Sequence, residues 1–180
     1  RANGIASDIL VVQITAMNDA DVLLVAGDDV YDTNPADSSL IMADDLTVEA
    51  ANGTSDGPTA VNITTKVHAL LLTVTGMNVG DVSINEVDAI DLRSVTTADG
   101  SITVVAGGTI TATKVISLNP NSIDNSPVAA APHRDISLRA NGIASDILVG
   151  QITAMNDADV LLVAGDDVID TNPADSSLIM

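Results

Sequence analysis

Aspartate has the most potential for chemistry in this sequence, because it recurs in a short group whose spacing repeats. Asp28, Asp29, Asp32 and Asp37 fall within ten positions of one another. Carboxylate and turn carbonyl oxygens are the ligands that Ca²⁺ prefers, so this group is a candidate calcium site. The alternative is that these residues only start strands and turns and keep the surface soluble, since no EF-hand loop or GGxGxD nonapeptide is present. The equivalents in a later copy of the same segment complete the candidate set: Asp166, Asp167, Asp170 and Asp175.

Other ionisable groups give less reason to expect catalysis. Glu86, Asp88 and Asp91 could act as the paired carboxylates of a glycosidase, but sugars also need aromatic rings to stack on, and the sequence has one Tyr, no Phe and no Trp. We therefore expect these three side chains to face solvent on one coil. His68 and His133 lie far apart in the sequence and have no cysteine partners, which favours exposed or loop-packed histidines over a metal or catalytic site. No G-x-S-x-G motif occurs, and we expect no enzyme activity and no cofactor other than calcium.

A near-identical repeat organises the chain around these residues. Residues 139–180 repeat residues 1–42 with two differences: Val12 is replaced by Gly150, and Tyr31 by Ile169. The offset between the copies is the same at every position, which is typical of tandem arrays. We expect residues 1–180 to form one continuous solenoid, in which a first repeat, 1–138, is followed by the first part of the next, as a window on a longer protein.

Composition and charge narrow the class of partner. The chain carries 25 acidic and 6 basic residues, a net charge of −19, which opposes binding to nucleic acid and to anionic membranes. No run of apolar residues is long enough to span a bilayer, so we expect no membrane insertion. Hydrophobic residues make up 46% of the chain and aromatic residues 1%, which suits a narrow aliphatic core. The expected partners are further copies of the same array, with other cells or glycans as the alternative.

Short segments of alternating apolar and polar residues indicate an all-β fold. Examples are Asp21–Ala26, Asp45–Ala50, Ser101–Ala106 and Asp135–Ala140, each with apolar side chains at every second position. Counted from Asp21, successive segments begin 24, 36, 20, 34 and 24 positions apart, and the last of these steps reaches Asp159, the copy of Asp21.

This spacing predicts a parallel β-helix with coils of about 20–24 residues. The two longer intervals are either one coil with a loop excursion or two tighter coils. Residues Asn52–Thr59 and Asn119–Arg134 are the expected excursions, because they are rich in Gly, Pro, Asn and Ser.

Three stretches resemble the coils of filamentous-haemagglutinin-like proteins and giant bacterial surface proteins. They are Asp21–Ser55, Gly80–Val95 (GDVSINEVDAIDLRSV) and Gly100–Val115 (GSITVVAGGTITATKV). The resemblance implies a secreted, right-handed parallel β-helix of bacterial origin, of the kind used in adhesins, surface fibres and toxin stalks. It implies an extracellular or cell-surface location.

These observations predict a structural segment of a long extracellular fibre built from tandem repeats. One alternative is the stalk of an adhesin that binds cells or glycans through other regions. A second is a string of calcium-stabilised immunoglobulin-like or cadherin-like sandwiches, which the run Met17–Val22 suggests.

Overall fold

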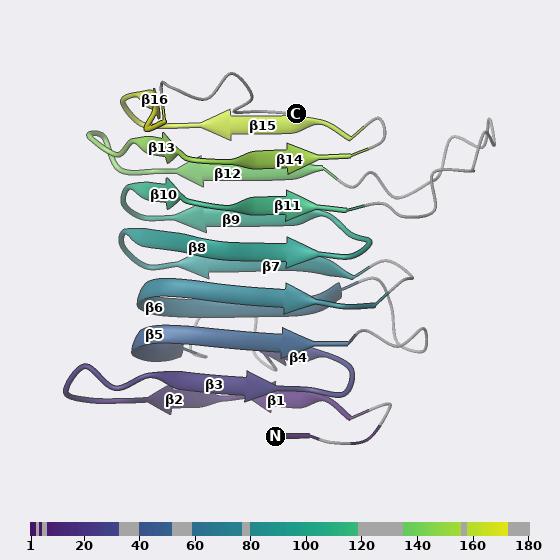
Figure 1. Cartoon of the computed structure of the whole chain (residues 1–180). Helices are drawn as coiled ribbons and strands as arrows, with labels where there is room; N and C mark the ends of the chain where they lie inside the picture. The colour runs from purple at the N-terminus through teal and green to yellow at the C-terminus, as the bar shows by residue number, and fades with distance from the viewer. Residues whose placement is uncertain are drawn as a thin grey trace, which may run out of the picture.

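The computed structural model describes residues 1–2, 4, 7–32, 40–51, 59–76, 80–118, 135–155 and 158–172. These residues form strands and no helix, so no helix is present among them that could cross a membrane. All strands belong to one hydrogen-bonded sheet that coils upon itself (Figure 1). In chain order the strands are β1 (Ile9–Val11), β2 (Gln13–Thr15), β3 (Val22–Val25), β4 (Val30–Asp32), β5 (Leu40–Ala50), β6 (Thr59–Val74), β7 (Asp81–Glu86), β8 (Ile90–Thr97), β9 (Ile102–Ala106), β10 (Ile110–Ala112), β11 (Val115–Ser117), β12 (Ile136–Ala140), β13 (Ile147–Val149), β14 (Ile152–Ala154), β15 (Val160–Val163) and β16 (Val168–Asp170).

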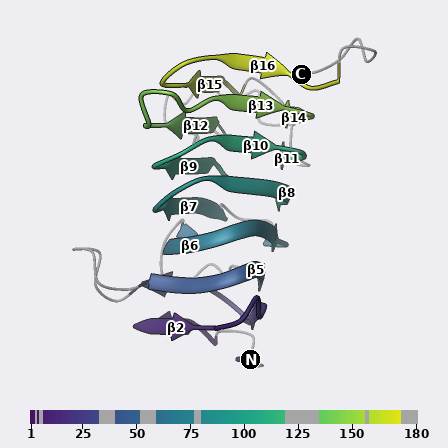
Figure 2. The same cartoon turned by 90° about the vertical axis from the view of Figure 1, so that its left-hand side faces the viewer.

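The coil has two faces that stack strand upon strand (Figures 1 and 2). The front face in Figure 1 contains β3, β8, β10, β11, β13, β14 and β16; the rear face contains β1, β2, β4, β7, β9, β12 and β15. The long strands β5 and β6 bend from the rear face to the front face, and they pair along both parts. From the N-terminus upward, front strands run to the right and rear strands to the left, so the coil is right-handed. The predicted right-handed parallel β-solenoid is confirmed.

Strand pairing fixes the length of each coil. Ser101 precedes β9 and lies 20 positions after Asp81, the first residue of β7, while Asp45 lies 24 positions after Asp21. In both cases the later residue sits directly over the earlier one. Ile102 then pairs with Ile136, so this longer interval is one coil with an excursion. The predicted excursion at 119–134 lies outside the described residues, as does most of the one at 52–59.

Every strand pair in the described residues is parallel, which excludes one alternative. Immunoglobulin-like and cadherin-like sandwiches are built from antiparallel sheets. The expectation of such sandwiches is therefore wrong for this part of the chain.

A narrow aliphatic core lies between the two faces. In β9 the side chains of Ile102, Val104 and Ala106 are buried and alternate with more exposed neighbours, and β12 repeats the pattern one coil later with Ile136 and Leu138. Stacked β-branched and Leu side chains fill this space, and each fully buried one stabilises the fold by about 1.5–3 kcal/mol. The near absence of aromatic residues thus matches a core filled by aliphatic side chains.

The two copies of the repeated segment lie on opposite faces. Between Ile9 and Ile147 the chain passes from one face to the other eleven times, which is five and a half turns. The segment starting at Ile9 is therefore on the rear face, and its copy at Ile147 is on the front face. The count from sequence, which treated Asp21 and Asp159 as equivalent positions on the coil, is wrong by half a turn. The long interval from Asp45 to Asp81 accounts for the difference, since it runs from the front face to the rear face.

Candidate cation sites and a buried carboxyl at the turns

The turn before β4 stacks on the turn before β1 and brings three aspartates together. Asp28 and Asp29 precede β4, Asp8 precedes β1, and one carboxylate oxygen of each lies within 4.8 Å of the others. The backbone N–H of Asp29 donates to Asp8 Oδ1 at 3.3 Å, and the Asp29 carbonyl accepts from the N–H of Ile9 at 2.8 Å. These bonds tie the carboxylates to strand ends that the β1–β4 pairing holds in place.

The second copy builds the same triad on the other face. Asp146, Asp166 and Asp167 meet within the same distance, and Asp167 N–H donates to Asp146 Oδ1 at 3.1 Å. The triads differ in burial. Asp28 and Asp29 are buried because a further coil covers them, with the N–H of Ala51 bonded to the Asp28 carbonyl, whereas Asp166 and Asp167 lie in the last described coil and are exposed.

The triads contain only some of the aspartates predicted from sequence. Asp32 and Asp170 end strands β4 and β16 and lie outside the triads, and Asp37 and Asp175 lie outside the described residues.

Asp8 and Asp146 were missed by the sequence analysis. Asp8 stands 21 positions before Asp29, the same step that separates Ile9 from Val30. The coil length was therefore the signal that could have found them.

Three carboxylates and nearby carbonyls form a suitable donor set for Ca²⁺. This ion takes six to eight oxygen ligands, and carboxylates, backbone carbonyls and water all serve. The residues present thus supply part of such a coordination shell in each copy.

Glu86, predicted to face solvent, is buried in the structure. It is 2% exposed, at the inward position that follows Val82 and Ile84 in β7. Glu86 Oε2 accepts hydrogen bonds from Thr65 Oγ1 at 2.8 Å and from the N–H of Val67 at 3.1 Å. The expectation that Glu86 faces solvent is wrong, because alternation from Val82 directs it into the core, where the preceding coil provides donors.

Burial sets the protonation of Glu86. Loss of solvation raises its pKa from 4.5 to about 7, and the side chain of Asp88 also raises it. Hydrogen bonds from Thr65 and from the backbone N–H groups of Asp88 and Val67 act in the opposite direction. Glu86 therefore changes charge near neutral pH while enclosed by the coil.

The other two acidic residues of this group pair with cations at the surface. Asp88 forms an ion pair with Lys66 at 3.5 Å, and Asp91 lies 3.7 Å from Arg93 Nε. Arg93 also pairs with Asp45, two coils below.

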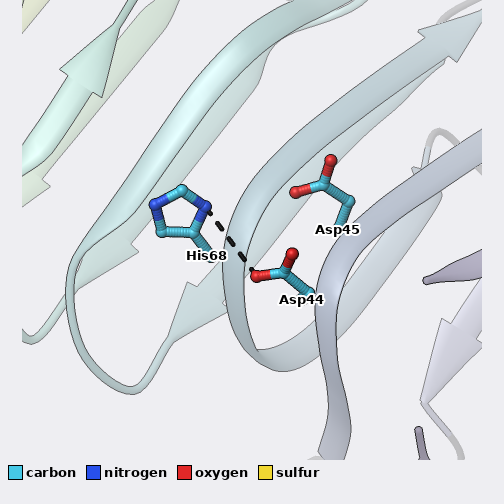
Figure 3. A group of neighbouring side chains, drawn as sticks. All are labelled: Asp44, Asp45 and His68. Carbon is cyan, nitrogen blue, oxygen red and sulfur yellow. Dashed lines mark ion pairs between the residues drawn. The ribbon is translucent and has the colours of Figure 1, made fainter. Parts of the chain in front are cut away.

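His68 lies at the bend of β6 and meets two aspartates from the bend of β5. Its Nδ1 is 4.0 Å from Asp44 Oδ1, and Asp45 is next to them (Figure 3). His133 lies outside the described residues.

Fold and surface together define a parallel β-solenoid with carboxylates grouped at its turns. No family model, no curated protein and no solved structure matches this chain. The class therefore rests on the strand pairing and the core.

Proposed function

We propose that this chain is a structural segment of a long extracellular or cell-surface fibre, assembled from tandem repeats of the length of residues 1–138. The observation that carries the proposal is that both copies of the repeated segment enter one sheet and one core. A repeat that adds coils to an existing rod lengthens the rod without needing a new fold. The resemblance to filamentous-haemagglutinin-like proteins supports a secreted, bacterial origin.

The proposed role is mechanical, not catalytic. Parallel strands on both faces form hydrogen-bond ladders along the axis, and aliphatic side chains stack along the same direction. A force along the axis is then shared among many ladder bonds in each coil. The acidic surface keeps the rods soluble and makes them respond to cations.

The half-turn offset between successive repeats makes the two faces of such a fibre equivalent. Because one repeat covers five and a half turns, each surface group reappears on the opposite face in the next repeat. A self-associating fibre would thus offer the same contacts to neighbours on both sides.

Rod length as a function of repeat number tests the proposal. Five and a half coils at about 4.8 Å each extend the rod by about 26 Å per repeat. We expect proteins with two, three and four repeats to form straight rods that lengthen by this step in electron micrographs. Separate globular beads, or a length that does not grow with repeat number, would rule the proposal out.

We also propose that Ca²⁺ is the ion of the two aspartate triads. The supporting observation is that the same three residue positions converge in both copies, although the copies lie on opposite faces of the coil. Occupied triads would offset carboxylate repulsion at the turns and stiffen the stacking of neighbouring coils.

A further inference from the structure

We infer that Asp44, Asp45 and His68 form a second kind of metal site, selective for a divalent first-row transition metal such as Zn²⁺. The proposal is independent of the fibre function and of the calcium triads. It rests on the donor set, on the hydrogen bonding of the two carboxylate oxygens of Asp45 and on the charge around the site.

Stacked bends bring the three donors together. Strands β5 and β6 both turn from the rear face to the front face here, and their register places Ala43 beside Val67 and Asp45 beside Ala69. His68 is consequently the neighbour of Asp44 on the next coil. One donor atom from each of the three side chains lies within 4.8 Å of the others, and Figure 3 shows the imidazole facing the carboxylates.

The donor set distinguishes this site from the triads. An imidazole nitrogen suits Zn²⁺ and its neighbours in the first transition row, whereas Ca²⁺ prefers oxygen alone. Zn²⁺ binds nitrogen and oxygen at about 2.0–2.2 Å, which puts tetrahedral ligands about 3.3 Å apart. The 4.0 Å between His68 Nδ1 and Asp44 Oδ1 is only slightly longer than this ligand–ligand distance. The His68 side chain is 70% exposed and can rotate toward the carboxylates.

The carboxylate of Asp45 is held so that one of its oxygens is available to bind a metal ion. Its Oδ2 is paired with Arg93 Nη1, and Arg93 is in turn held by Asp91. Its Oδ1 is buried and accepts no hydrogen bond from the described residues. Buried polar atoms in proteins almost always have a hydrogen-bonding or metal partner, so a bound ion would account for this oxygen. The hydrogen bond from the Arg93 guanidinium fixes the other oxygen, as hydrogen bonds to metal-binding carboxylates commonly do.

The local charge favours a dication. Asp44, Asp45 and Asp91 supply three negative charges against the single positive charge of Arg93. The carboxylate of Asp21 adds a fourth negative charge on the coil below, where its Oδ1 accepts a hydrogen bond from the N–H of Asp45 at 3.3 Å. A metal ion bound by His68, Asp44 and Asp45 would reduce this repulsion, with water completing its coordination.

Zinc titration of the full 180-residue chain, followed by NMR of its two histidine side chains, tests the site. We expect Zn²⁺ to shift the ring signals of His68 and to leave those of His133 in place. Isothermal titration should show one zinc site that His68→Ala removes and that Asp44→Asn weakens at least tenfold. His133→Ala is the matched control and should bind like the wild type. Amide spectra of each variant check that the fold is retained.

Competition separates this site from the triads. An Asp8→Asn/Asp146→Asn variant should keep the His68-dependent zinc site, and a hundredfold excess of Ca²⁺ should not displace the zinc. Unmoved His68 signals, equal zinc binding by His68→Ala, or displacement by Ca²⁺ would each overturn the proposal.

Discussion

Ile9 and Ile147 are the same residue of the repeat, yet they lie on opposite faces of the coil. Ile9 pairs with Val30 on the rear face, whereas Ile147 pairs with Ile110 and Val168 on the front face. Each copy keeps its internal pairing, since Val30 and Val168 are also equivalents. The strand pairing within the repeated segment is therefore the same in both copies, and only the face of the rod on which the segment lies differs.

Tight packing surrounds Gly150, one of the two positions that differ between the copies. The N–H of Gly150 donates to the Ala112 carbonyl oxygen at 2.9 Å, so its backbone stacks directly on the preceding coil, whereas Val12 lies in the first coil that the structure describes. A Cβ at Gly150 would lie 2.8 Å from the carbonyl oxygen of Thr113, closer than side chains normally approach backbone. We found no structural reason for the replacement of Tyr31 by Ile169.

Restoring valine at position 150 should destabilise the protein. Gly150→Val forces the backbone of two coils apart, and we expect a loss of about 1–3 kcal/mol in the free energy of unfolding. Urea titration measures the loss. Val12→Gly is the matched control and should change stability by less than about 1 kcal/mol. Equal effects of the two changes would contradict the stacking at Gly150.

Stability should depend on pH through Glu86. Because burial raises its pKa from 4.5 to about 7, the folded chain holds the proton more tightly than the unfolded chain. The stabilisation from protonated Glu86 is complete below about pH 4.5 and is lost as the pH rises through about 7. Glu86→Gln stays neutral and should match the wild type at pH 4 but exceed it by about 1–3 kcal/mol at pH 8.

Urea unfolding at both pH values measures this difference. The exposed Glu49 is the other glutamate, and Glu49→Gln provides the control for the loss of one surface charge. The account of Glu86 fails if Glu86→Gln and Glu49→Gln depend on pH alike.

Buried hydroxyl groups should hold the turn between the faces. Ser117 Oγ donates to the Gly100 carbonyl at 2.8 Å, and Thr97, its neighbour one coil below, donates to the Gly80 carbonyl at 3.1 Å. Ser117→Ala leaves a buried carbonyl without its donor, and we expect a loss of about 1–3 kcal/mol. Ser137→Ala, at an outward position of β12, should cost less than about 0.5 kcal/mol. Thermal unfolding of both variants distinguishes the two positions, and similar melting temperatures would refute a structural role for Ser117.

Calcium should stabilise the fold through the triads. At a Ca²⁺ concentration roughly 10–100 times the dissociation constant, each site adds about 1–3 kcal/mol. We expect Asp8→Asn/Asp146→Asn to remove the calcium-dependent rise in melting temperature. Asp32→Asn/Asp170→Asn removes the same charge outside the triads and should keep the rise. Sodium chloride of equal ionic strength screens charge in all variants, so a rise of the same size with sodium would exclude specific binding.

The sequence was informative where structure follows from local alternation. Ser101–Ala106 and Asp135–Ala140 predicted strands β9 and β12, with Ile102 and Leu138 in the core, because period-two patterns need no knowledge of partners. The aliphatic composition likewise predicted a narrow core.

The features that the sequence did not predict depend on which residues of neighbouring coils lie side by side. Glu86 is acceptable in the core only because Thr65 and Val67, one coil away, donate to it. Asp8 joins Asp29 for the same reason. The half-turn offset depends on the path through β5 and β6, which residue spacing alone does not reveal.

Disulfide trapping at Leu148 tests the central claim, that the repeats continue one coil with a change of face. The chain has no cysteine, and adjacent strands lie about 4.8 Å apart, within the range that a disulfide spans. Leu148 pairs with Thr111 on the front face, whereas Thr103 is on the rear face. We expect Leu148→Cys/Thr111→Cys to form an intramolecular disulfide, detected by mass spectrometry after mild oxidation, and Leu148→Cys/Thr103→Cys to stay reduced. A disulfide in the second pair and none in the first would contradict the claim.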